Sequence, residues 1–133
     1  MAKGISIIFK SYSETIPKIL NLLKLEKELV KHTTIILKPH ITSIVEESTS
    51  PALVEQVLRY CLTHKSKDSK ILIAEGADGV ETTDLFSSYK YKELAERYGI
   101  SLIDLNNAEV QEIEDGEFLK FSKIYYPKIL LES

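Results

Sequence analysis

The chain has 133 residues, of which 44% are hydrophobic and 28% charged, and its net charge is −3. This composition is typical of one soluble globular domain, and the weakly negative charge disfavours a nucleic-acid partner or an anionic membrane surface. The single cysteine, Cys61, excludes an intrachain disulfide and a cluster held by this chain's cysteines. The sequence does not identify a cofactor, and it indicates no residues as metal ligands.

The first apolar run, Ile5–Ile8, is too short for a secretion signal, and no run approaches the ~18 apolar residues of a membrane span. We therefore expect a cytoplasmic protein without a membrane partner. The domain is expected to occupy residues 1–133, as a single α/β unit.

Four short apolar runs predict strands. Because they are almost continuously apolar, they are typical of a sheet that helices cover. They are Ile5–Phe9, Thr33–Lys38, Lys70–Glu75 and Ile100–Leu105.

Helical spacing of apolar residues predicts one helix between each pair of strands. The first covers Ser13–Lys31, the second begins at Ser50 and Pro51, and the third covers Tyr89–Tyr98 and stops at Gly99. The order β-α-β-α-β-α-β predicts an open, mostly parallel, three-layer sheet of the Rossmann-like kind.

A different pattern follows residue 105. Short strands are predicted at residues 108–113, 117–121 and 128–131, and Asp115 with Gly116 is a hairpin signal between the first two. We therefore expect a C-terminal antiparallel hairpin.

Ligands in open α/β sheets usually bind beyond the carboxyl ends of the strands. The second predicted strand ends in Lys38, Pro39 and His40. Proline forces an extended backbone on Lys38, whose ammonium would then suit a phosphate or carboxylate. Lys38 could equally close the strand as a solvated side chain, and His40 has no second histidine at metal-ligand spacing.

Two further segments carry polar groups. Thr49 and Ser50 open the second helix, where free N–H groups attract anions, although Ser50 could be a plain N-cap. The third strand ends in Glu75, Gly76 and Asp78, and two carboxylates there could transfer protons or hold Mg²⁺ through waters. An ordinary turn fits this segment as well, and Asp104 at the end of the fourth strand could join it or cap a turn.

The segments IILKPHITS, STSPALVEQVLRYCL, KILIAEG, YKELAERYGISLIDLN and YYPKILLES, in this order and spacing, resemble the family called domain of unknown function 362. The resemblance covers roughly residues 30–133, and it implies an α/β fold with association, in some members, with iron–sulfur modules. His40 stands where the family usually has asparagine. The family pattern falls on Lys38, Pro39, Thr49, Pro51, Glu75 and Gly76.

Family members usually continue into a second half, so the resemblance implies that this chain is either a fragment of a longer protein or a short version. Three functions stay open. The chain could be half of an enzyme with an anion or metal-linked site, a non-catalytic module for a small anion or nucleotide, or an assembly unit. The expected partners are a second copy in a homodimer or the absent C-terminal half.

Overall fold

The computed structural model describes residues 4–114, 120 and 122–132. The helices are α1 (Tyr12–Leu22), α2 (Glu26–Leu29), α3 (Pro51–His64), α4 (Thr82–Ser88), α5 (Tyr91–Tyr98) and α6 (Lys128–Leu131), with the 3-10 helix η1 (Val45–Glu47). The strands are β1 (Thr34–Leu37), β2 (Lys70–Glu75), β3 (Ser101–Asp104), β4 (Val110–Glu114) and β5 (Lys123–Pro127). None of the described helices is long and apolar enough to cross a membrane.

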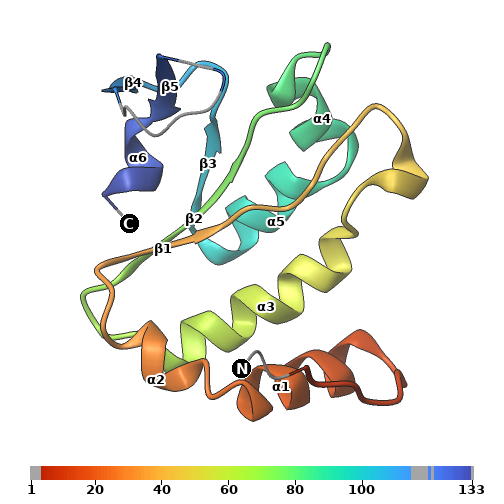
Figure 1. Ribbon diagram of the computed structural model, residues 1–133. Helices are drawn as coiled ribbons and strands as arrows, with labels where there is room; N and C mark the ends of the chain where they lie inside the picture. The colour runs from red at the N-terminus through yellow and green to blue at the C-terminus, as the bar shows by residue number, and fades with distance from the viewer. Residues whose placement is uncertain (1–3, 115–119, 121, 133) are drawn as a thin grey trace.

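A three-stranded parallel sheet forms the centre of the fold, in the order β1-β2-β3. Helix α3 connects β1 to β2, and α4 and α5 connect β2 to β3. The sheet lies on one side of α3 and α1 packs on the other, while β4, β5 and α6 lie at the opposite end of the molecule from α1 (Figure 1). The predicted mixed α/β class with a mainly parallel sheet is confirmed.

The core lies between the sheet and α3. Ile35 of β1 faces Ile71 of β2 in register, and alternation along β2 buries Ile73 completely. Leu58 and Cys61 project from α3 into the same core. Burial raises the pKa of the Cys61 thiol, so it behaves as a small apolar side chain rather than a nucleophile.

The N-terminal expectations need correction. Residues 5–9 are not a strand, because no strand of the described residues pairs with them, and 88% of Ile8 is exposed. The helix predicted for Ser13–Lys31 divides into α1 and α2, since Lys24 takes a left-handed backbone (φ 58°) that interrupts it. Pro17 lies inside α1, beyond its first turn.

Further differences follow β2. Helix α4, whose short sequence is rich in serine and threonine, was not predicted, and the predicted helix from Tyr89 begins at Tyr91. Between them Lys90 adopts a left-handed backbone (φ 63°).

The C-terminal hairpin is confirmed, since β4 pairs antiparallel with β5. Its second strand in the structure is Lys123–Pro127. Of the predicted strand at 117–121, residues 117–119 and 121 lie outside the described residues, as do Asp115 and Gly116 of the hairpin signal. The predicted strand at 128–131 is wrong, because these residues form α6. An apolar run this short fits a strand or a helix turn equally well.

Candidate functional site

The carboxyl ends of β1 and β2 bring Lys38 and Glu75 together. The Lys38 Nζ donates to Glu75 Oε1 at 3.0 Å and to Oε2 at 3.2 Å. The Glu75 side chain is only 4% exposed, whereas that of Lys38 is 52% exposed. The carboxylate of this ion pair is therefore buried, whereas its ammonium lies at the surface.

Two groups surround the Glu75 carboxylate besides Lys38. The backbone N–H of Gly76 donates to Oε1 at 2.9 Å. Tyr91 of α5 is fully buried nearby, and burial first, then the negative charge of Glu75, raise the pKa of Tyr91. Hydrogen bonds to the charged form favour a buried carboxylate, so Lys38 and Gly76 together stabilise the negative charge of Glu75.

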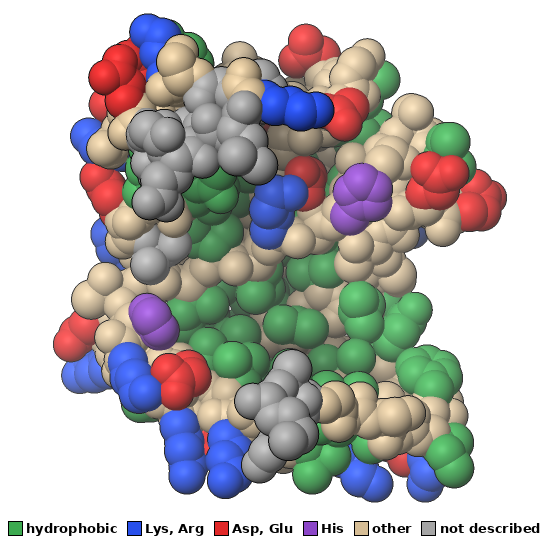
Figure 2. Space-filling view, in the orientation of Figure 1, with side chains coloured by type: hydrophobic (Ala, Val, Ile, Leu, Met, Phe, Trp, Pro, Cys, Tyr) green, Lys and Arg blue, Asp and Glu red, His purple; other side chains and the backbone are tan. Residues whose placement is uncertain are grey.

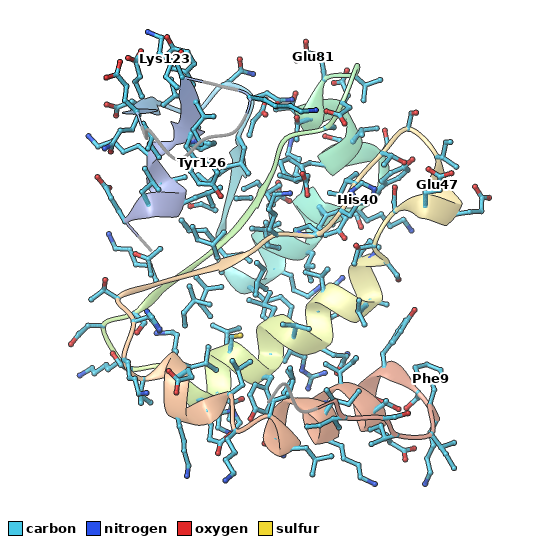
Figure 3. All side chains as sticks on the ribbon, in the orientation of Figure 1. Phe9, His40, Glu47, Glu81, Lys123 and Tyr126 are labelled. Atoms are coloured by element: carbon cyan, nitrogen blue, oxygen red, sulfur yellow. The ribbon has the colours of Figure 1, made fainter. Side chains whose placement is uncertain are left out.

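Thr49 holds the loop after β1 against the start of α3. Its Oγ1 accepts from the His40 N–H at 3.1 Å, and its own N–H donates to the His40 carbonyl at 2.7 Å. The Thr49 carbonyl accepts from the Tyr91 hydroxyl at 2.7 Å. Figure 3 shows His40 on this loop, above the start of α3. His40 is exposed, two residues after Lys38.

Asn106 follows β3 and lies at the edge of the site. Its Nδ2 donates to the Ala77 carbonyl at 2.8 Å, and it lies 3.4 Å from the hydroxyl of the buried Thr82. A Cβ on Gly76 would come 2.5 Å from Asn106 Oδ1. A larger residue at 76 would therefore require the asparagine side chain to move.

Asp104 is paired in register with Glu75 but makes different contacts. One carboxylate oxygen accepts from the Asn106 N–H at 2.9 Å and the other from Asn107 Nδ2 at 2.7 Å. These bonds fix the turn after β3. Asp104 thus caps a turn, which was one of its two predicted roles.

The predicted residues separate into those the structure brings together and those it leaves apart. Lys38, Glu75 and Gly76 form one cluster, and His40 and Thr49 are bonded to each other. Asp78 is exposed and has no hydrogen bond or ion pair with any described residue, so the structure shows no Glu75–Asp78 carboxylate pair. Within the described ranges, no group of three or more His, Cys, Asp or Glu side chains could hold a metal.

Ser50 precedes the first turn of α3, but its side chain makes no capping bond. It lines a cavity of about 320 Å³ between the loop before α3 and the turn that joins α4 to α5. The lining residues are Val45, Ser48, Thr49, Ser50, Pro51, Ser88, Tyr89 and Lys90.

Three residues that hold the loops at the carboxyl edge of the sheet were not predicted from the sequence. They are Tyr91, Thr82 and Asn106. Tyr91 has the spacing of an ordinary helix core residue, which conceals the bond from its hydroxyl to Thr49. The small residues Gly76 and Ala77 were a signal that another side chain approaches the turn closely, but they could not say that Asn106 supplies it.

Replacing Tyr91 with phenylalanine tests how the buried Tyr91 hydroxyl contributes to stability. A raised pKa keeps the folded-state tyrosine protonated, so its contribution to stability is complete below pH 10.0, the ordinary tyrosine pKa, and is lost as pH rises above it. We expect the unfolding free energy of the wild type to fall by about 1 kcal/mol more than that of Tyr91→Phe between pH 9 and 11.

Urea unfolding at several pH values measures this difference. Tyr126→Phe is the matched control, because Tyr126 is an exposed tyrosine on β5, away from the site. Parallel curves for the wild type and Tyr91→Phe would show that Tyr91 ionises equally in the folded and unfolded chain.

Comparison with known proteins places residues 35–133 in one family, which is described as Domain of unknown function (DUF362). No curated protein and no solved structure matches the chain. The matched region begins within β1 and includes all the residues of the site described above.

Proposed function

Because the chain belongs to the DUF362 family, whose description states no activity, we propose that its function is to bind a small molecule through an anionic group at the carboxyl edge of the sheet. The observation that carries the proposal is the pair of exposed Lys38 with buried Glu75. An ammonium has three N–H donors, and two bonds to Glu75 leave one donor for a ligand.

Glu75 makes Lys38 suitable for this role. A free lysine loses much side-chain entropy when it binds a ligand, whereas the carboxylate already holds the Lys38 side chain in one place. A phosphate or carboxylate would meet an ammonium that is ordered in advance. The exposed His40, two residues after Lys38, offers a further contact for the rest of the molecule.

A binding role is favoured over acid–base catalysis by Glu75. Both carboxylate oxygens accept hydrogen bonds from Lys38, and Oε1 also accepts from Gly76. A general base needs an oxygen within reach of the substrate's proton. Glu75 is instead a positioning residue, and its role is to orient Lys38.

A thermal-shift screen of the full chain tests the proposal, with inorganic phosphate, pyrophosphate, nucleotides and di- and tricarboxylates as probes. A ligand at ~100 times its Kd stabilises the folded state by about 2.7 kcal/mol, which raises Tm by roughly 10 °C for a domain of this size. Hits are then measured by calorimetry at low temperature, where we expect Lys38→Met to stay folded.

We expect Lys38→Met to lose binding and Lys92→Met to keep it. Lys92 is an exposed lysine on α5, so it controls for the loss of one positive charge. The proposal is wrong if no probe raises Tm, or if both variants bind a hit equally well.

A further inference from the structure

The positive charge of the chain is concentrated near its N-terminus. Residues 1–31 contain six lysines and three glutamates, a net charge of +3, whereas residues 32–133 contain eleven basic and seventeen acidic side chains, a net charge of −6. The overall charge of −3, which on its own disfavours an anionic membrane partner, conceals this division. Such asymmetry is typical of proteins that contact an anionic surface with one end.

Three lysines in this region are available for a partner. Lys10 pairs with Glu14 at 3.6 Å and Lys31 with Glu28 at 2.8 Å. Lys18, Lys24 and Lys27 are exposed, and none of them makes an ion pair with another described residue. Their charges are therefore not neutralised within this part of the molecule.

Large apolar side chains lie at the surface of the same region. The exposed fraction is 88% for Ile8, 59% for Phe9 and 51% for Leu22. Lys18 and Leu22 are four residues apart on α1, so they lie on one side of the helix. In Figure 2 the lower edge of the molecule, along α1, shows blue side chains with green ones between them and little red, and Figure 3 shows Phe9 at one end of α1.

We call this surface the basic apolar edge, and it consists of Ile8, Phe9, Lys18, Leu22, Lys24 and Lys27. We infer that the basic apolar edge binds the surface of an anionic lipid bilayer. Lysines attract the headgroups, while the exposed apolar side chains enter the boundary between headgroups and acyl chains. Both kinds of side chain are required, because either interaction alone gives weak and reversible binding.

Charge and side-chain type favour a bilayer over the alternatives. A symmetric dimer through this edge would bring the unpaired lysines of two copies together, since the same patch faces itself across a two-fold axis. A single-stranded nucleic acid stacks its bases on several aromatic side chains, but Phe9 is the one aromatic side chain of the basic apolar edge, and Ile8 and Leu22 are aliphatic. An anionic bilayer offers headgroups to the lysines and acyl chains to the aliphatic side chains.

Co-sedimentation of the full chain with vesicles tests the inference. One set contains phosphatidylcholine alone and the other contains one-third phosphatidylserine. We expect binding only to the anionic vesicles, and we expect it to disappear as the salt rises from about 0.1 M to 1 M, where the Debye length falls from ~10 Å to ~3 Å.

Two sets of variants separate the contributions. Each lysine near an anionic surface contributes a factor of about five, so Lys18→Gln with Lys24→Gln and Lys27→Gln should weaken partitioning roughly a hundredfold. The matched control changes three exposed lysines elsewhere, Lys67→Gln with Lys70→Gln and Lys92→Gln, and should bind as the wild type does. Phe9→Ser should weaken binding without any change of charge.

Three results would overturn the inference. They are equal binding to both kinds of vesicle or to neither, an equal loss of binding in the control triple variant, and a homodimer in sedimentation velocity that Phe9→Ser dissociates. The last result would assign the basic apolar edge to a second copy of the chain.

Discussion

Replacing Lys38 with methionine is expected to lower the unfolding free energy by about 2 kcal/mol. The variant leaves the carboxylate of Glu75, whose side chain is only 4% exposed, with the Gly76 N–H as its remaining partner. Breaking a fully buried pair costs ~3–5 kcal/mol. The figure for this chain is lower because Lys38 is half exposed, so water reaches the position that its ammonium leaves.

A double-mutant cycle measures the pair itself by urea unfolding. Glu75→Leu leaves Lys38 free to be hydrated, so it should cost less than Lys38→Met. The double variant should cost less than the sum of the two single variants, by about 1–2 kcal/mol. Additive costs would mean that the two side chains do not interact in solution.

Replacing Gly76 with alanine is expected to destabilise the fold by about 2 kcal/mol. The new Cβ would lie 2.5 Å from Asn106 Oδ1 and 3.3 Å from the Leu105 Cβ. The Asn106 side chain must therefore move, which breaks its 2.8 Å hydrogen bond to the Ala77 carbonyl. Thermal unfolding followed by circular dichroism measures the change.

Gly4→Ala is the matched control, because a Cβ at Gly4 would meet no atom within 4 Å, and it should change stability very little. Asn106→Ser shortens the obstructing side chain. Asn106→Ser should therefore lower the unfolding free energy less in the Gly76→Ala variant than in the wild type. If Gly76→Ala is as stable as the wild type, the close approach of Asn106 to the turn is wrong.

Several elements were predictable because local chemistry and tertiary packing agree. Strand β2 covers the predicted residues Lys70–Glu75, and α3 begins at Pro51, where proline is tolerated because the first helical N–H needs no partner. The convergence of Lys38 and Glu75 also follows from sequence, since parallel neighbours end at the same edge of a sheet.

Other features depend on contacts that no local pattern reveals. Residues 5–9 have the composition of a strand, but a strand also needs a neighbour to pair with. Lys24 ends α1 with a left-handed backbone that usually marks glycine or asparagine. Which carboxylate Lys38 would meet, Glu75 rather than Asp78, depends on the path of the turn at Gly76 that Asn106 fixes.

The most direct test of the proposed site is an amide NMR titration of the full chain with inorganic phosphate, with Lys38→Met titrated in parallel. The amides of Gly76 and His40 should shift most, because one contacts the Glu75 carboxylate and the other lies two residues from Lys38. The shifts should saturate, and they should be absent in Lys38→Met. Shifts confined to other parts of the chain, or unchanged in the variant, would contradict an anion site at the carboxyl edge of this sheet.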